Sequence, residues 1–255
     1  EVGLCTDFFQ IAQKMFSRTK KMEVGSAVLS ILASGGPIAI AERVGAFLAL
    51  HGMDDTEERR LHIGFSAGRF EFMARPYGII PRNIVEEAAW PALRGQIFGE
   101  ASEIFLRLLN GEVISSNMIK DTILTRENFR SDEDWERVQI AAKEFSNQNE
   151  VTEKIEIPHR YDFEEIKTIP QNWRRDLLNL VLGSHDPKLQ IEVNKWRPVQ
   201  VFNLSITPPH IIEETHERMD ENYHVDGGKW NRSMMPRTIM VFVNNEDGLS
   251  SEEQS

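Results

Sequence analysis

The spacing of apolar residues changes near residue 150, and this change constrains the fold of the chain more than any other feature. From residue 6 to about residue 130 the apolar residues recur at helical intervals, so that one side of each segment is apolar. Beyond residue 150, short segments rich in β-branched residues alternate apolar and polar positions, which is typical of strands. We therefore expect an α+β protein. A predominantly helical N-terminal part, either a bundle or an orthogonal helix array, should be followed by a smaller mixed α/β part with short strands.

Local start and stop signals divide the two parts into elements. Thr6 or Asp7 can cap one helix, Pro37 stands at a first-turn position of another, and Asn83 can cap a third. The helices expected in the first part cover residues 8–16, 26–33, 37–50, 56–74, 83–110 and 131–145. The elements expected in the mixed part are helices over 171–182 and 209–223 and strands over 152–157, 189–193, 199–206 and 238–243.

The polar stretch at residues 146–150 separates the two parts. We predict a helical domain over residues 1–148, a mixed α+β domain over residues 149–243, and an acidic flexible tail over residues 244–255. The chain contains 40% hydrophobic and 27% charged residues, which is the composition of an ordinary globular protein. Its most apolar window, residues 24–50, is interrupted by charged residues, glycines and a proline, so we expect no membrane span.

The single cysteine, Cys5, excludes an intrachain disulfide and a cysteine-based zinc site. It agrees with a reducing compartment, and no signal peptide is visible in the sequence. We expect the protein in the cytoplasm, in another reducing compartment, or in a particle assembled there.

Negative charge is concentrated in the second half of the chain. Residues 1–130 contain 15 Lys and Arg against 16 Asp and Glu, whereas residues 131–255 contain 14 against 24. The net charge of −11 therefore arises almost entirely after residue 130. Such an asymmetry predicts one face that can hold an anion and another that repels it.

Arginines alternate with aromatic residues in one stretch of the neutral half. Guanidinium groups bind phosphate through paired hydrogen bonds and aromatic rings stack on bases, so this stretch has the composition of a single-stranded nucleic-acid groove. The candidate nucleic-acid-binding residues are Arg59, Arg60, Arg69, Arg75, Tyr77 and Arg82. A structural explanation stands beside this one: the arginines pair with nearby glutamates such as Glu57 and Glu86, and the aromatic residues belong to the core.

A second cluster combines carboxylates and imidazoles on the helix expected over residues 209–223 and just beyond it. Residues three or four positions apart lie on one face of a helix, where they can hold a divalent metal. The candidate ligands are Glu213, His216, Glu217, Asp220 and His224, and the metals considered for them are Zn, Mn and Fe. The alternative is a solvated acidic face opposite apolar residues that turn to the core.

Common catalytic motifs are missing from the sequence. It contains no Walker-type phosphate loop and no G-x-G-x-x-G after an expected strand. Residues 64–68 read Gly-Phe-Ser-Ala-Gly and match G-x-S-x-G. That motif requires a strand leading into the serine, whereas the flanking residues have helical spacing, so we expect no serine hydrolase.

These observations favour a non-enzymatic, self-assembling structural protein without a cofactor, such as a coat or nucleocapsid subunit. Its expected partners are copies of itself and single-stranded nucleic acid bound by the arginine stretch. A metal-dependent enzyme that uses the cluster at residues 210–226 is the first alternative. A protein–protein adaptor is the second.

Overall fold

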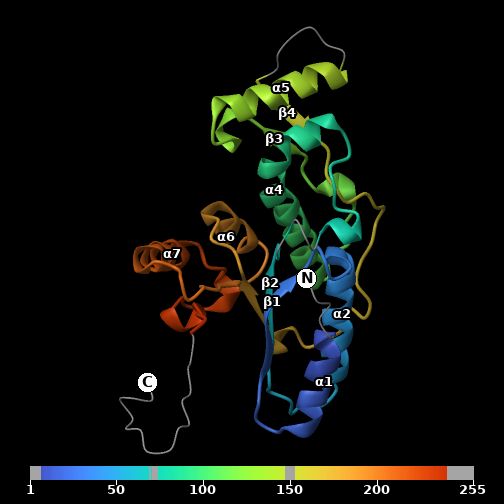
Figure 1. The fold of residues 1–255 in the computed structure, drawn as a ribbon. Helices are drawn as coiled ribbons and strands as arrows, with labels where there is room; N and C mark the ends of the chain where they lie inside the picture. The colour runs from blue at the N-terminus through green and yellow to red at the C-terminus, as the bar shows by residue number, and fades with distance from the viewer. Residues whose placement is uncertain (1–6, 69, 71–73, 147–152, 240–255) are drawn as a thin grey trace, which may run out of the picture.

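A parallel sheet of four strands lies at the centre of the molecule (Figure 1). The computed structural model describes residues 7–68, 70, 74–146 and 153–239. The strands follow the order β1-β2-β5-β6, and the expected mixture of helices and strands is confirmed. The strands are β1 (Val24–Ser30), β2 (Leu61–Ser66), β5 (Leu178–Leu182) and β6 (Gln200–Val201).

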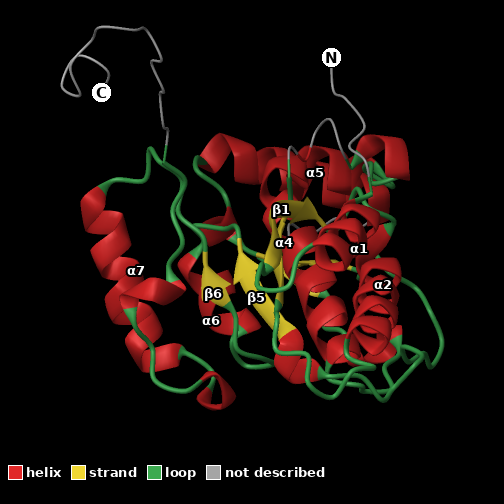
Figure 2. Ribbon diagram, turned by 90° about the horizontal axis from the view of Figure 1, so that it is seen from below, coloured by secondary structure: helices red, strands yellow, loops and turns green. Residues whose placement is uncertain are grey.

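Helices precede and connect these strands. They are α1 (Phe8–Arg18), α2 (Gly36–His51), α4 (Ile84–Leu109), α5 (Asp132–Ser146), α6 (Pro187–Val193) and α7 (Pro209–Asn222). In Figures 1 and 2, α1 and α2 lie at the β1 end of the sheet, whereas α6 and α7 lie at the β6 end. α4 packs against both α2 and α5. A small antiparallel pair, β3 (Thr122–Leu124) and β4 (Ile155–Ile157), lies close to α5 in Figure 1.

The four strands run in the same direction, so the sheet has two chemically different edges. We call the edge where the strands end, at Ser30, Ser66, Leu182 and Val201, the carboxyl edge. The amino edge is where the strands begin. A helix that connects two parallel strands runs back across the sheet, so the loop before each strand lies at the amino edge.

The core lies between one face of the sheet and helices α2 and α4. Phe65 of β2 is completely buried, and its ring centre lies 5.5 Å from that of Phe105 and 6.3 Å from that of Phe98, both on α4. Leu61 and Ile63 alternate with outward-facing positions of β2 and are buried in the same core. This packing holds β2 against the longest helix of the described chain.

Three glycines allow the chain to follow this path. A Cβ atom on Gly64 would lie 2.3 Å from the carbonyl oxygen of Ala27, so β1 and β2 approach each other closely because position 64 has no side chain. Gly35 and Gly36 have φ angles of 98° and 88°, a region that other residues rarely adopt. They turn the chain from the end of β1 into α2.

Helices with local start signals form where the sequence predicts them. Asp7 caps α1 by accepting a hydrogen bond from the backbone N–H of Gln10, and Asn83 caps α4 in the same way at Val85 and Glu86. α4 continues through Pro91 without ending. The helices expected over residues 37–50, 131–145 and 209–223 are α2, α5 and α7, and the strand expected over 152–157 is present as β4 in the described residues.

Other elements differ from the prediction because their apolar patterns are ambiguous. The sequence predicts helices over 26–33, 56–74 and 171–182, but these ranges overlap the strands β1, β2 and β5. A buried parallel strand is apolar on both faces, so it lacks the alternation that identifies a strand. Residues 189–193 alternate but belong to α6, where the cap at Asp186 and the first-turn Pro187 outweigh the pattern. Of 199–206 only residues 200–201 form a strand, and 240–243 lie outside the described residues.

The sheet draws strands from both sides of the predicted boundary at residue 148. β1 and β2 precede this position, and β5 and β6 follow it. The division into two domains stays a prediction, and the tail over residues 244–255 lies outside the described residues. Within the described part of the chain, no helix combines the length and apolarity that crossing a bilayer requires.

Candidate functional site

Polar side chains gather at the carboxyl edge of the sheet, where parallel α/β sheets bind their ligands. Ser30 and Ser66 end β1 and β2, are partners in the strand register, and are 4% and 5% exposed. The hydroxyl of Ser30 donates to the carbonyl oxygen of Ala67 at 3.2 Å, and the hydroxyl of Ser66 accepts from the backbone N–H of Gly68 at 2.9 Å. The two serines therefore hold the loop after β2 over the end of the sheet.

The ends of β5 and β6 continue this row. The backbone N–H of Gly183 donates to Phe65 at 2.8 Å, and that of Phe202 donates to Leu182 at 2.9 Å, so the residues after β5 and β6 lie in line with Ser66. Exposed His185 follows β5, and its Nε2 lies 3.5 Å from the hydroxyl of Thr207. Thr207, 5% exposed, comes from the loop after β6. An imidazole that reaches solvent thus contacts a buried hydroxyl.

Asn203 is the most unusual residue of this edge. It is 1% exposed, yet neither its side-chain oxygen nor its side-chain nitrogen has a hydrogen-bond partner among the described residues. Its backbone is held on both sides, by the carbonyl of Pro236 at 2.9 Å and the N–H of Thr238 at 3.0 Å. A buried amide without partners costs about 1–3 kcal/mol, and such groups are commonly satisfied by a ligand or by water.

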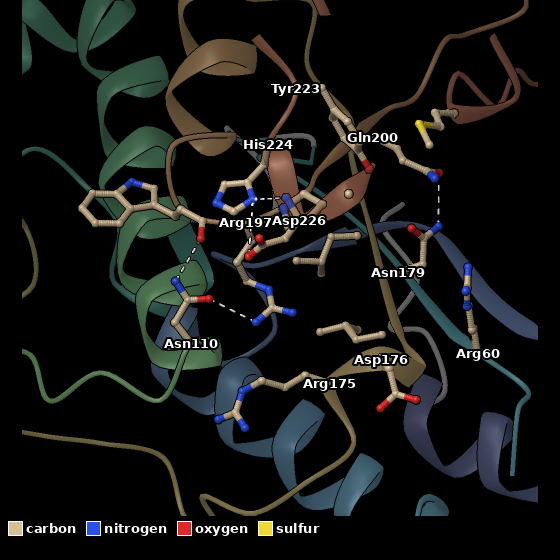
Figure 3. A pocket seen from close by; sticks show the side chains of 16 residues that line it. Arg60, Asn110, Arg175, Asp176, Asn179, Arg197, Gln200, Tyr223, His224 and Asp226 are labelled. Atoms are coloured by element: carbon tan, nitrogen blue, oxygen red, sulfur yellow. Dashed lines mark hydrogen bonds and ion pairs between the residues drawn. The ribbon is translucent and has the colours of Figure 1, made fainter. Parts of the chain in front are cut away.

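A cavity of about 790 Å³ lies at the opposite, amino edge (Figure 3). Its walls come from the residues before β2, β5 and β6 and from the segment that follows α7. The polar side chains of its lining include Arg60, Arg175, Asn179, Arg197, Gln200 and Tyr223. This cavity therefore does not coincide with the edge at which α/β sheets usually carry chemistry. We treat the carboxyl edge as the candidate reaction site, because general fold rules and the orphaned Asn203 amide both indicate it.

A row of polar side chains crosses the sheet toward the cavity. His62 Nε2 lies 2.7 Å from a carboxylate oxygen of Glu23, and His62 Nδ1 lies 2.9 Å from the side-chain nitrogen of Asn179. An amide nitrogen only donates, so Nδ1 accepts and the proton of the neutral ring is on Nε2. The same nitrogen of Asn179 donates to the side-chain oxygen of Gln200 at 3.1 Å. The row leaves the oxygen of Asn179 and the nitrogen of Gln200 without side-chain partners among the described residues.

The structure distributes the predicted arginine stretch over both edges of the sheet. Arg59 and Arg60 precede β2, whereas Arg75 and Arg82 come after it, and a strand of six residues is about 20 Å long. Arg59 is fully engaged: its guanidinium binds Glu57 at 2.5–2.8 Å and donates to two backbone carbonyls of the α1 region.

The rest of the stretch shows the same pattern of individual pairing. Arg82 binds the carboxylate of Glu86 at 2.5 Å, while Arg75 and Tyr77 lie exposed on a short 3-10 turn. Arg69 lies outside the described residues. Among the described members, Arg59 and Arg82 are each neutralised by a separate glutamate. The described arginines therefore do not act together as one continuous anion-binding groove.

The ion pair of Glu57 predicts a pH effect on stability. Its hydrogen bonds with Arg59 lower the pKa of Glu57 from 4.5 to about 2. A carboxylate with a lowered folded-state pKa stabilises the protein fully above pH 4.5 and loses this contribution as the pH falls toward 2. In urea titrations, Glu57→Gln should be less stable than the unchanged protein at pH 6, and the difference should shrink steadily between pH 4.5 and pH 2. A difference that does not vary with pH would contradict the assigned ion pair.

The five predicted metal ligands do not come together as a metal site. Glu213 forms an ion pair with Arg232, and His216 Nδ1 accepts a hydrogen bond from Trp230 at 2.9 Å. His224 lies beyond the end of α7 and lines the amino-edge cavity instead. Across the ranges that the structure describes, no three His, Cys, Asp or Glu side chains are arranged to hold a metal ion. Glu217 and Asp220 lie exposed on α7.

Most residues of both edges carry no recognisable signal in the sequence. Ser66 had a signal, since it is the serine of the Gly64–Gly68 motif, and the strand that the motif requires does lead into it as β2. The expectation of helical flanks before this serine is therefore wrong. No sequence signal marks Asn203 or Arg197, because the surroundings of each side chain are formed by residues far away in the sequence.

The fold has a counterpart among solved structures. The chain is similar to the crystal structure of monooxygenase RslO1 from Streptomyces bottropensis, with a TM-score of 0.54 and 14% sequence identity. The similarity covers 95% of this chain and 56% of that protein, so the chain spans little more than half the length of its counterpart. No family model and no curated protein matches the sequence.

This similarity corrects the functional expectation. At 14% identity it establishes the architecture alone, but that architecture is the one of a protein described as a monooxygenase. The expectation of a non-enzymatic coat or nucleocapsid subunit that binds RNA is wrong. Its physical basis also fails, because much of the presumed helical packing core is the parallel sheet, and acids of the same region bind Arg59 and Arg82.

Proposed function

We propose that this chain is the sheet-forming part of an enzyme, and that the enzyme carries out a mono-oxygenation at the carboxyl edge of the sheet. The observation that carries the proposal is the buried amide of Asn203, which has no hydrogen-bond partner among the described residues and follows β6 at the same edge of the sheet as Ser66. The shared architecture with a monooxygenase supports the reaction class. Because the chain spans 56% of that protein, the activity of the whole enzyme is part of the proposal.

A mono-oxygenation inserts one oxygen atom of O2 into the substrate and releases the other as water. It consumes two electrons and two protons, and a redox group such as a flavin or an iron ion would supply the electrons. The side chains of the carboxyl edge would bind and orient the substrate through the Asn203 amide and exclude water from it. His185 is exposed and contacts Thr207, so it is suited to exchange protons between the site and solvent.

Oxygen-isotope labelling tests this proposal. The purified chain is incubated under ¹⁸O2 with a small-molecule extract, with reduced flavin in one arm and ferrous iron plus ascorbate in the other. We expect products that carry one ¹⁸O atom and that depend on the protein in one of the arms. Absence of labelled product in both arms, or incorporation of two labelled atoms, would contradict a mono-oxygenation.

The variant Asn203→Leu distinguishes a role of Asn203 in the reaction at the carboxyl edge from a role in stabilising the fold. Replacing an unpaired buried amide by an apolar side chain of similar volume should leave the melting temperature unchanged or raise it. Loss of a positioned hydrogen-bonding group should lower product formation about tenfold or more. Arg137→Gln, which changes an exposed side chain on α5, is the matched control and should leave both unchanged. Full activity of Asn203→Leu would show that Asn203 is not part of the site.

A further inference from the structure

The cavity at the amino edge is large enough for a small molecule. Its volume of about 790 Å³ falls within the range of about 300–1,000 Å³ typical of ligand sites. Figure 3 shows Arg197 and Arg60 on opposite sides of the cavity, with Asn179 and Gln200 between them. The cavity lies at the opposite edge from the proposed reaction site, so it needs a separate explanation.

Two arginines of the cavity are engaged at the end of α4. The carbonyl oxygen of Leu109 accepts from Arg175 Nε at 3.0 Å and from a terminal nitrogen of Arg197 at 3.3 Å. That nitrogen of Arg197 also donates to the side-chain oxygen of Asn110 at 3.1 Å. The last carbonyls of a helix carry partial negative charge, so these two cations have a structural role there.

The carboxylates of the cavity act on its cations from separate places. Burial, followed by the positive charge of Arg175, lowers the pKa of Arg197 to about 10, and the carboxylate of Asp226 opposes this shift. On the other side, Arg174 and more weakly Arg60 lower the pKa of Asp176. Charges of both signs therefore lie around the cavity, and the neutral groups between them must select the ligand.

Two neutral amides in the cavity each keep one hydrogen-bonding atom free. The side-chain nitrogen of Asn179 donates to His62 Nδ1 at 2.9 Å and to the side-chain oxygen of Gln200 at 3.1 Å, so both of its protons are used. The oxygen of Asn179 and the nitrogen of Gln200 have no hydrogen bond to a described residue, and both half-buried side chains line the cavity. The cavity thus presents an acceptor and a donor from two side chains that are bonded to each other.

The ring of Tyr223 forms an aromatic wall of the same cavity. Its centre lies 5.0 Å from that of the buried Trp230 ring. A Cβ atom on Gly227 would overlap the Tyr223 ring, so the ring lies directly against this glycine. Burial raises the pKa of the Tyr223 phenol, which therefore stays uncharged at neutral pH. A ring held in this way offers a flat, neutral surface to another ring.

An acceptor near a donor favours one arrangement of ligand atoms. A carboxylate would place an oxygen against the free oxygen of Asn179, and a ketone would leave that oxygen unpaired. A ring amide carries N–H and C=O on adjacent atoms, so it can donate to Asn179 while it accepts from Gln200. A ligand that lacks one of these groups leaves a polar atom of the site unpaired, which weakens binding.

We propose that the amino-edge cavity binds a neutral cyclic amide, a ring with N–H and C=O on adjacent atoms as in a lactam or a pyrimidinone. Its N–H donates to the oxygen of Asn179, its C=O accepts from the nitrogen of Gln200, and the ring lies against Tyr223. The site is separate from the carboxyl edge, so it does not depend on the proposed mono-oxygenation.

Calorimetric titration of the full chain with carbostyril, a bicyclic lactam, tests this site. N-methylcarbostyril has the same C=O but no N–H, and β-naphthol has a similar shape with a hydroxyl group instead of the amide. We expect carbostyril to bind with a Kd about tenfold lower than that of either comparison compound, because only carbostyril pairs with both free atoms. Equal affinity for one of the comparison compounds, or the absence of saturable binding, would overturn the proposal.

Variants of Gln200 locate the binding within the cavity. Gln200→Glu keeps an oxygen that accepts from Asn179 but replaces the free donor by a second acceptor, so the Kd for carbostyril should rise about tenfold or more. Gln13→Glu is the matched control, since it makes the same change at an exposed position of α1, and it should leave the Kd unchanged.

Circular dichroism must show that the Gln200 variant is folded. Gln200→Leu, which removes the donor without adding charge, replaces it if Gln200→Glu unfolds, and its Kd should rise to a similar extent. Unchanged affinity for carbostyril in a folded variant of either kind would contradict the assigned site, whatever the outcome of the oxygen-labelling experiment.

Discussion

Replacing Glu86 with alanine should lower the free energy of unfolding by about 3–5 kcal/mol, because it leaves a buried cation without its partner. Glu86 is 1% exposed in the first turn of α4. Its carboxylate accepts from the backbone N–H and the Nε of Arg82 at 2.7 and 2.6 Å, and from Arg160 at 3.1 Å. The side chain of Arg160 is only 11% exposed, so little water reaches it to replace the lost carboxylate.

The same carboxylate joins distant parts of the chain. Arg82 also donates to the carbonyls of Pro158 and His159, at 2.7 and 3.0 Å, so the start of α4 is tied to the segment after β4 through one cluster. Urea denaturation followed by circular dichroism measures the effect. Glu87→Ala is the matched control, since Glu87 lies in the same helical turn but is exposed, and should cost less than about 1 kcal/mol. Equal midpoints for the two variants would disprove a buried ionic cluster.

Phe65→Ala should destabilise the protein by a similar amount, about 3–5 kcal/mol, for a different reason. Phe65 is 0% exposed, and its ring packs on Phe98 and Phe105 of α4. Truncation removes this packing and leaves a cavity at the centre of the core, where the surrounding elements can relax only partly. Since Ser66 is the next residue, the change should also loosen the carboxyl edge.

Chemical denaturation of Phe65→Ala beside Ile123→Ala checks this prediction. Ile123 lies on β3 and is 57% exposed, so its truncation should change the free energy of unfolding by no more than about 0.5 kcal/mol. A loss below about 1 kcal/mol for Phe65→Ala would mean that β2 is not the centre of the core.

Helices were predictable from the sequence where their signals are local. The caps at Asp7 and Asn83 bind N–H groups only two or three residues away, and Pro37 is compatible with a helix by its own geometry. These interactions exist in a short segment, so the sequence of that segment is enough to recognise them. The mixed α and β content followed from the same local patterns.

The parallel strands required information that no local window contains. β2 pairs with β1 and with β5, and the bond between His62 and Asn179 joins residues 117 positions apart. Leu61–Ser66 is buried on most of its length, so its apolar run has neither strict alternation nor a clear helical face. The pairing energy that makes it a strand comes from distant neighbours.

At the two edges of the sheet, too, some features are visible in the sequence and others arise only from the fold. The sequence by itself determined the charge asymmetry, the helix boundaries with caps, and the presence of a serine between two glycines at Ser66. Only the tertiary structure decided that Ser66 ends a strand beside Ser30, that Arg60 and Arg197 line one cavity, and that Arg59 pairs with Glu57 instead. The physical reason is that hydrogen bonds and burial between remote segments set the environment of each side chain, and its chemistry depends on that environment.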